Sequence, residues 1–464
     1  MAFPLRLTPF EEYMFADDRP EYPMLGFFRL RFSALLDAAA LESSLQATLS
    51  RHPLTTCKIL RRGWRYFWIP DENFRPKLEC FVPDASRNYP EAKWIDPTAE
   101  SCTRSWLIDR GGKHELVVQI HHAVIDALGM CQFIEDLLVD YARRAGIAET
   151  PLEPRPLDPG RLPHRNRFGL TWRNFTSVLP PVSLMLDGAK YVLKKPPTPL
   201  LPEPPAGVTS IPLPSRYPTS STDTLSADET RQILAAAKRQ GCTVNDLLAR
   251  DLFLAMLDLR VRSGCETDKD WLRLAMPVNL RGPGDEKLSV ANVISVVFIA
   301  RSPSEMADRG QLLRSLQRQM RFIKDHRLSL TFALSLAIAQ YIPGHIYRNA
   351  RKHDCWATGV FSNLGMILKD VPLPRREGRL ALGNVTLDEL EFIPPMRPRT
   401  AFVCAVYTYA GRLYVLFHCD PRMVSPAQAE EFRTLYLERI RQSIQAEPGD
   451  APADAARPKV THDR

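Results

Sequence analysis

Two adjacent histidines and an aspartate, His121, His122 and Asp126, form the most specific chemical pattern in the sequence. They stand at the end of an apolar, strand-like run and just before the helix-like segment 127–146. Because side chains alternate along a strand, the two imidazoles should point to opposite faces, one lining a cavity and the other packing inside. A histidine held in this way can act as a general base near neutral pH. Asp126 falls in the turn, within reach of a basic partner.

The same residues have a purely structural interpretation. A buried polar group without a partner costs stability, so the motif could simply cap a strand and satisfy a buried turn. A zinc site is less favoured, because no third and fourth ligand stands at a suitable spacing. The nine cysteines are scattered and never spaced CxxC, which predicts reduced thiols in a cytoplasmic protein, with no metal bound.

Composition places the chain among globular proteins. It has 464 residues, 45% of them apolar and 25% charged, which excludes a wholly disordered chain, collagen and a coiled-coil rod. The net charge of +8 predicts an anionic partner such as a phosphorylated cofactor or a lipid surface. No motif supports nucleic-acid binding. The N-terminal residues lack the pattern of a signal peptide, and the apolar stretch 328–344 is interrupted by proline and is too short to span a bilayer.

The order of patterns predicts two halves. Strand-like and helix-like segments fill residues 1–150, a proline-rich stretch covers 151–220, and globular patterning returns over 221–440. The sequence around His418 repeats the order seen at His121, an apolar strand followed by a histidine, an aspartate and a long helix. We therefore expect an N-terminal half at 1–205, which includes the linker, a C-terminal half at 206–440 and a disordered tail at 441–464.

Four basic segments are either solvated faces or binding sites for phosphate. They lie at residues 61–65, 165–168, 311–327 and 348–353. One of them, if close to the active site, could hold the diphosphate of coenzyme A or the phosphopantetheine of an acyl carrier protein. The basic helix at 311–327, followed by the apolar 328–342, could instead make a peripheral membrane contact.

In order along the chain, several segments resemble the HHxxxDG acyltransferase superfamily, which includes condensation domains, wax ester synthase/diacylglycerol acyltransferases and polyketide-associated acyltransferases. The resemblance covers residues 10–435 and rests on LTPFEEYMFADDRPEYPM, LSRHPLTTCKI, HHAVIDALGM, MPVNLRG, NVISVVFI, VFSNLGMI and RLYVLFHCDPRMVS. It implies an α/β fold of two chloramphenicol acetyltransferase-like halves, each a mixed sheet with flanking helices, and a channel between them.

The resemblance also implies a function and a set of roles. An acyl group moves from a thioester to an alcohol or amine, with His122 as the base in the middle of the channel. Asp126 is a structural orienter, paired with Arg281. Ser362 and Asn363 are candidate oxyanion donors. No cofactor is permanently bound. The donor is acyl-coenzyme A or an acyl carrier protein, and coenzyme A is preferred because no adenylation or carrier module follows in the sequence.

One departure from the family pattern keeps a second hypothesis open. The glycine that follows the aspartate in the family is Ala127 here. Alanine enters the positive-φ region only with strain, whereas Gly129 could supply a close approach nearby. The alternative is therefore a catalytically silent binding member of the condensation-domain fold.

Overall fold

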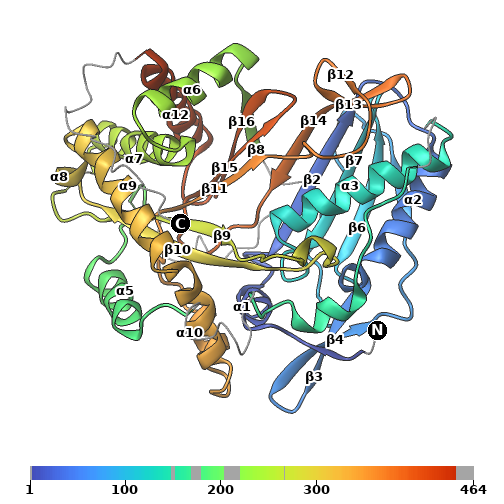
Figure 1. Cartoon of the computed structure of the whole chain (residues 1–464), viewed down its shortest axis with the longest axis horizontal. Helices are drawn as coiled ribbons and strands as arrows, with labels where there is room; N and C mark the ends of the chain where they lie inside the picture. The colour runs from blue at the N-terminus through green and yellow to red at the C-terminus, as the bar shows by residue number, and fades with distance from the viewer. Residues whose placement is uncertain (1–2, 148–151, 169–178, 203–219, 266, 446–464) are drawn as a thin grey trace, which may run out of the picture.

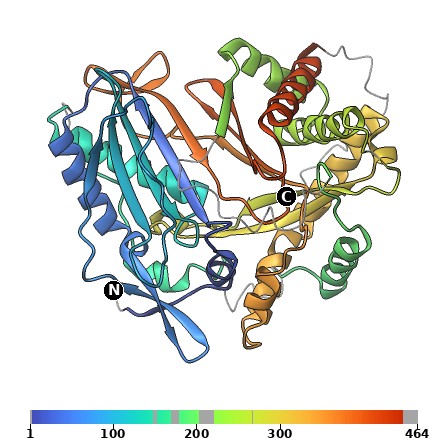
Figure 2. The same cartoon turned by 180° about the vertical axis from the view of Figure 1, so that it is seen from behind.

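The computed structural model describes the chain except residues 1–2, 148–151, 169–178, 203–219, 266 and 446–464. Two lobes lie side by side, each built on a β-sheet with helices against it (Figures 1 and 2). This is the α/β architecture of two mixed sheets expected from the sequence. Within the described ranges, no helix combines the length and apolarity needed to cross a lipid bilayer.

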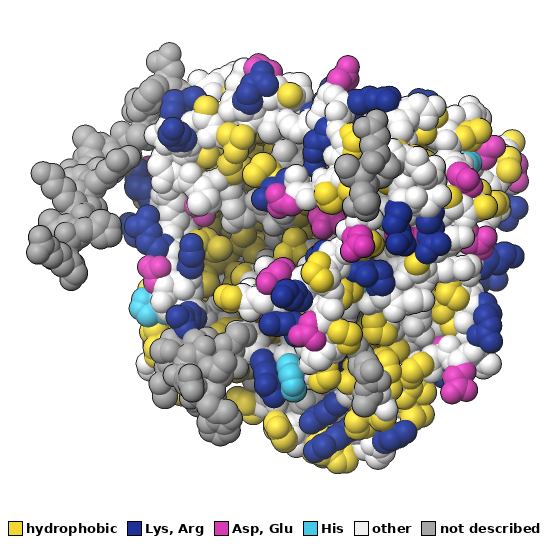
Figure 3. All heavy atoms as spheres, turned by 45° about the vertical axis from the view of Figure 1, so that its right-hand side comes forward, with side chains coloured by type: hydrophobic (Ala, Val, Ile, Leu, Met, Phe, Trp, Pro, Cys, Tyr) yellow, Lys and Arg dark blue, Asp and Glu magenta, His cyan; other side chains and the backbone are white. Residues whose placement is uncertain are grey.

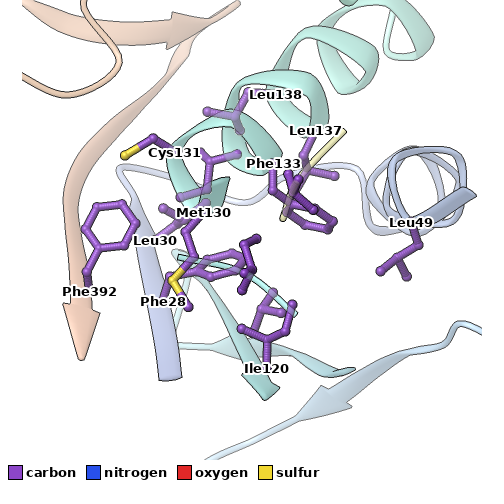
Figure 4. Close-up of a cluster of buried hydrophobic side chains, with 14 of the residues drawn as sticks. Phe28, Leu30, Leu49, Ile120, Met130, Cys131, Phe133, Leu137, Leu138 and Phe392 are labelled. Atoms are coloured by element: carbon purple, nitrogen blue, oxygen red, sulfur yellow. The ribbon is translucent and has the colours of Figure 1, made fainter. Parts of the chain in front are cut away.

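The N-terminal lobe contains a seven-stranded sheet in the order β12-β13-β14-β2-β7-β6-β5. Only β5 and β6 pair in parallel, so the sheet is mixed. Its strands are β2 (Leu25–Phe32), β5 (Leu78–Phe81), β6 (Thr103–Asp109), β7 (His114–His121), β12 (Arg375–Arg376), β13 (Arg379–Leu382) and β14 (Val385–Ile393). Helices α2 (Ala38–Arg51) and α3 (Ala127–Arg144) cover one face, where Phe28 and Ile120 of the sheet meet Phe133 of α3 (Figure 4).

The C-terminal lobe contains a six-stranded sheet in the order β10-β9-β11-β15-β16-β8. Its strands are β8 (Ser220–Thr224), β9 (Leu272–Asn279), β10 (Ile294–Arg301), β11 (Gly359–Met366), β15 (Phe402–Tyr409) and β16 (Arg412–Cys419). Helices α6 (Ala227–Arg239), α7 (Val244–Arg262) and α12 (Pro426–Gln445) pack on it through a second apolar core. Capping boxes at Ser226 and Thr243 start α6 and α7.

The remaining elements are short or lie at the periphery of the lobes. A small sheet in the order β1-β4-β3 consists of β1 (Leu5–Arg6), β3 (Cys57–Arg62) and β4 (Arg65–Pro70). The other α-helices are α1 (Pro9–Asp17), α5 (Val182–Lys194), α8 (Pro303–Met306), α9 (Arg309–Asp325), α10 (Thr331–Ala339) and α11 (His345–Ala350). The 3-10 helices are η1 (Pro53–Thr56), η2 (Pro159–His164), η4 (Asp285–Lys287) and η5 (Leu328–Leu330).

The chain crosses between the lobes, so a single boundary near residue 205 does not separate them. Strands β12 to β14 follow most of the C-terminal lobe in sequence, yet β14 pairs with β2 and completes the N-terminal sheet. The connection between β9 and β10 also reaches the N-terminal lobe, where the Lys287 carbonyl accepts a hydrogen bond from the Asp158 amide at 2.8 Å. The N-terminal sheet therefore contains strands from both ends of the sequence, because β14 pairs with the edge of β2.

Helices also occupy parts of the segments expected to be a linker and a tail. Helix α5 forms within the stretch 151–220 expected to be a proline-rich linker, and residues 169–178 of that stretch lie outside the described residues. Helix α12 continues to Gln445, so residues 441–445 of the expected tail are helical. Residues 446–464 lie outside the described residues.

Candidate functional site

His122 follows the last residue of β7 and is partly exposed. Its Nδ1 lies 2.8 Å from the Ile125 carbonyl oxygen. A carbonyl only accepts hydrogen bonds, so the neutral ring must carry its proton on Nδ1 and present the lone pair on Nε2. No hydrogen bond in the described part of the chain occupies Nε2. The turn therefore fixes the tautomer that a general base requires.

The electrostatic environment keeps this ring neutral. Desolvation inside the protein lowers the pKa of His122, and the nearby His121 acts in the same direction. The charge of Asp126 and the hydrogen bond to Ile125 oppose the shift without reversing it. A neutral imidazole with a free Nε2 can accept a proton at neutral pH.

Both lobes fix the backbone at His122. Its amide donates to the Met24 carbonyl at 2.7 Å, and its own carbonyl accepts from Asn292 Nδ2 at 2.7 Å. Asn292 stands in the connection between β9 and β10 and is the first residue of the segment NVISVVFI, which resembles the family. Its contact with His122 spans 170 residues, and nothing in the local sequence pattern around Asn292 indicates it.

Asp126 and Arg281 form the ion pair expected from the resemblance. Arg281 NH1 donates to Oδ2 at 2.8 Å and NH2 donates to Oδ1 at 3.0 Å. The Gly129 amide also donates to Oδ1, and the Val293 amide to Oδ2, each at 2.8 Å. Each carboxylate oxygen thus has two donors, and the Asp126 side chain is only 2% exposed. Asp126 has no accessible lone pair for a substrate, which agrees with a positioning role rather than proton transfer.

His52 of the N-terminal lobe also hydrogen-bonds to the connection between β9 and β10. His52 is fully buried, and its Nδ1 accepts a hydrogen bond from the Val290 amide at 3.2 Å. Its Nε2 lies 3.1 Å from Asp136 of α3. His52, like Asn292, was missed from the sequence, although it stands inside one of the segments quoted for the resemblance.

Ala127 occupies a position that does not need glycine. It is the first residue of α3, after Asp126 as the N-cap, and it is absent from the positive-φ residues of the described chain. The close approach is made at Gly129 instead. A Cβ there would lie 2.8 Å from Ile125 Cγ1 and 3.4 Å from the Ala291 carbonyl oxygen.

We predict that two small substitutions at this turn lower stability to different extents. Gly129→Ala should lower the free energy of unfolding by about 1–3 kcal/mol, because the added methyl group displaces Ile125 or the connection at Ala291. Ala127→Gly restores the family residue and should cost at most about 1 kcal/mol, the usual cost of glycine in a helix. Urea denaturation of both variants measures the difference. Equal stability of Gly129→Ala and wild type would contradict the close-packing argument.

The structure does not join the two candidate oxyanion donors to His122. Asn363 Oδ1 accepts a hydrogen bond from the Gly365 amide at 2.9 Å, so the side chain shapes a local turn. Ser362 stands opposite Ala405 in the register of β11 with β15. Neither side chain hydrogen-bonds to His122 in the described ranges, and their oxyanion role remains a prediction.

His121 points away from His122 into the interior. It is fully buried, its Nδ1 accepts from the Ala123 amide at 3.1 Å, and its Nε2 lies 3.6 Å from Asp18 Oδ2. In the C-terminal lobe, His418 near the end of β16 is also buried, with Nδ1 2.9 Å from the Pro394 carbonyl oxygen. Both strands precede a long helix, α3 and α12 respectively, which is the order on which the predicted repeat depends.

Two hollows in the described structure each have a volume of about 430 Å³ and are open to solvent. One lies between the lobes, lined by the loop after α1, by Trp94 and by Arg351 and His353. The other lies on the N-terminal lobe beside Tyr89 and Arg110. Neither has His122 in its lining, so the channel expected past His122 is not one of them. Within the described ranges, no three His, Cys, Asp or Glu side chains gather as metal ligands.

The four basic segments differ in their surroundings. Arg165 is buried in an ion pair with Glu11 at 2.6 Å and therefore has a structural role. Residues 61–65 form the exposed β3–β4 hairpin, and α9 carries an exposed basic face. Only the segment 348–353 contributes to a hollow, the one between the lobes. On the face shown in Figure 3, Lys and Arg side chains are scattered rather than gathered in one patch.

Comparisons with known proteins agree with this architecture. Residues 290–432 match the WS/DGAT C-terminal domain. No curated protein sequence matches the chain significantly. The first condensation domain of the calcium-dependent antibiotic synthetase, solved with a substrate analogue, superposes with a TM-score of 0.68 at 12% identity, covering 98% of this chain and 100% of that one.

Two further solved structures have the same fold. TRI3 trichothecene 15-O-acetyltransferase from Fusarium sporotrichioides gives a TM-score of 0.69 at 12% identity, over 95% of this chain and 94% of that one. Polyketide synthase associated protein 5 from Mycobacterium tuberculosis gives 0.59 at 15% identity, over 94% and 98%. The chain therefore has the chloramphenicol acetyltransferase-like fold that these solved structures share, and its residues 290–432 match the WS/DGAT C-terminal domain.

Proposed function

We propose that the protein is an acyltransferase that moves an acyl group from a thioester to an alcohol or amine, with His122 as the general base. One observation carries the proposal: the hydrogen bond from Nδ1 to Ile125 leaves Nε2 of a neutral imidazole free. The fold shared with an O-acetyltransferase and with condensation domains supports acyl transfer as the reaction class.

The proposed reaction balances without a metal or redox group. Nε2 removes the proton from the acceptor hydroxyl or amine as its oxygen or nitrogen attacks the thioester carbonyl. The tetrahedral intermediate then collapses with cleavage of the carbon–sulfur bond. The imidazolium returns its proton to the departing thiolate, which gives an ester or amide and a free thiol. Asp126 and Arg281 hold the turn that aims the ring.

A non-catalytic binding protein is the competing proposal. Its support in the structure is that His122 lines neither of the two hollows described above. Ala127 no longer supports it, because the first residue of α3 does not require glycine geometry. Incubation of the purified chain with acyl-coenzyme A and a panel of alcohols and amines decides between them. Release of free thiol together with a new ester or amide, seen by mass spectrometry, supports transfer; no product from any pair supports binding alone.

The rate should depend on pH through His122. Only the neutral ring accepts a proton, so kcat/KM should fall as pH drops through the pKa of His122, which burial places below the ordinary value of about 6.5. Activity should therefore be flat on the acid side of neutrality and decline about tenfold per pH unit only below that pKa. Circular dichroism at each pH is the control, because burial also lowers the pKa of His52 and His418, whose protonation opposes folding. An acid limb centred above 6.5 in the folded protein would contradict the assignment.

A further inference from the structure

Asn292 is the one polar side chain in an apolar run, residues 290–294 (VANVI), that lies against the N-terminal lobe. It is only 2% exposed, and a buried amide costs free energy unless its donors and its acceptor find partners. Nδ2 donates to the His122 carbonyl at 2.7 Å, whereas Oδ1 is buried without a hydrogen bond among the described residues. An apolar side chain would avoid this cost, so packing alone does not explain an asparagine here.

The direction of the Asn292 amide follows from its partner. A carbonyl oxygen only accepts hydrogen bonds, so the nitrogen of the amide, and not its oxygen, must face the His122 carbonyl. The same nitrogen lies 3.5 Å from His122 Nδ1, but Nδ1 has a closer partner in the Ile125 carbonyl at 2.8 Å. With its proton directed at Ile125, Nδ1 has no lone pair for Asn292. The amide therefore acts on the main chain of His122 rather than on its ring.

Three groups from separate segments then fix His122. The Met24 carbonyl accepts its amide proton, the Ile125 carbonyl holds its ring, and Asn292 holds its carbonyl. Of the three, Asn292 alone stands in the connection between β9 and β10, and it alone acts through a side chain. A single substitution can therefore remove this contact and leave the other two in place.

The charged groups that act on the His122 ring are already paired or neutral. Burial is the main cause that lowers the pKa of His122, while the charge of Asp126 raises it and that of His121 lowers it. Arg281, which comes from the C-terminal lobe, is engaged by Asp126, and Asp18 lies 3.6 Å from His121 Nε2. Asn292 adds no charge. A change in the ring after its substitution therefore follows from geometry and burial and not from a lost counter-ion.

We infer that Asn292 is a positioning residue for the general base: its NH2 group holds the main chain of His122 from the opposite lobe, so that Nδ1 stays on Ile125 and Nε2 stays directed at the acceptor. The inference rests on the proposed function, because it names a further support of that base. It also makes the placement of the base depend on docking of the connection between β9 and β10. A displacement of about 1 Å at a reacting group can cost about 10²-fold in rate.

Asn292→Ala removes the donor and tests the inference in the full chain. We expect kcat for acyl transfer to fall by about 10–10²-fold with little change in KM, because the base acts in the transition state. The acid limb of kcat/KM should move to higher pH, toward the ordinary histidine value of about 6.5, since the ring loses part of the burial that lowers its pKa. An unchanged kcat would overturn the inference. So would a lower kcat with an unmoved acid limb, because a purely structural role predicts that result.

NMR correlations between the ring protons and ring nitrogens of histidine give a readout that does not require turnover. The His122 signals, assigned with His122→Ala, should show the proton on Nδ1 in the wild type. Asn292→Ala should shift them toward the other tautomer. Asn292→Asp keeps the size of the side chain, but a carboxylate cannot donate to a carbonyl, and its charge should raise the pKa of His122 further than alanine does. Ring signals equal to those of the wild type in both variants would overturn the inference.

Ile294→Ala is the matched control. Ile294 stands two residues further along the chain and packs against the apolar cluster of Phe10 and Leu336. The substitution removes as many heavy atoms as Asn292→Ala, so it should lower stability while the ring signals and the acid limb of His122 stay as in the wild type. Thermal melting of each variant identifies the folded fraction. Equal changes at His122 in the Ile294 and Asn292 variants would refute a specific role for Asn292.

Failure of this inference and failure of the proposed function give different results. If Asn292→Ala changes the ring signals of His122 but the wild type transfers no acyl group, the contact still positions the ring and the acyltransferase proposal fails. If the wild type transfers acyl groups through His122 and the Asn292 variants match it in rate and in ring signals, the reaction stands and this inference fails.

Discussion

Replacing His122 by alanine should lower acyl transfer by about 10²–10⁴-fold, the usual contribution of a general base. The loss should appear in kcat and kcat/KM alike, with little change in donor binding, because the base acts in the transition state. The measurement is initial-rate release of thiol from a medium-chain acyl-coenzyme A with the alcohol or amine that the wild type uses best. A His122→Ala variant with the wild-type rate would exclude His122 as the general base and assign the transfer to another group.

His121→Ala is the matched control for that experiment. The two histidines are adjacent, yet the ring of His121 is fully buried beside Asp18 and that of His122 is partly exposed. Loss of the His121 ring should reduce stability, which thermal melting detects, while the folded fraction keeps most of its activity. If both variants lost the same activity at full stability, the reaction would depend on the pair rather than on Nε2 of His122.

Local patterns in the sequence predicted much of what surrounds the site. The strand that ends at His121 and the helix that starts after Asp126 are both present. These features depend on neighbouring residues, so the sequence shows them directly. The pairing of Asp126 with Arg281 is different. The two residues stand 155 positions apart, and only the resemblance to a family indicated the contact.

The central strand β2 shows why other parts were not predictable. Arg29 stands in the middle of this strand and is 8% exposed, an arrangement that a local pattern disfavours. It is stabilised by an ion pair with Glu391 of β14 and lies 3.4 Å from Glu115 of β7. The partner on β14 comes from beyond most of the other lobe in sequence, so neither the strand nor the completed sheet could be inferred from nearby residues.

The hydrogen bonds that hold the connection between β9 and β10 were also not predicted, because their partners lie far away in the sequence. Val290, Asn292 and Val293 contact the N-terminal lobe through His52, His122 and Asp126 respectively. Two of the three contacts use a backbone amide, which any residue supplies, so side-chain identity carries no signal for them. The geometry of the base therefore depends on docking between lobes that no single motif encodes.

Because the Asp126–Arg281 ion pair joins the two lobes beside His122, we expect its loss to lower both stability and activity strongly. Asp126→Ala should lower the free energy of unfolding by about 3–5 kcal/mol, because it leaves Arg281, whose side chain is only 10% exposed, without its counter-charge. It also removes the acceptor of the Gly129 and Val293 amides, so the turn that holds His122 should lose its geometry and activity should fall as well. Denaturant unfolding and thiol-release rates measured on the same preparations follow both effects.

A double-mutant cycle separates positioning from direct chemistry. Arg281→Ala alone should be about as damaging as Asp126→Ala, because it leaves the buried carboxylate unpaired. The double variant should be less destabilised than the sum of the two, since neither charge then remains without its partner. Asp126→Asn keeps the size of the side chain but removes its charge and replaces one acceptor oxygen by an NH2 donor that faces two N–H groups, so it should also be destabilised. If Asp126→Ala kept full stability while activity disappeared, Asp126 would take part in proton transfer itself, although both of its oxygens are already engaged by two donors each.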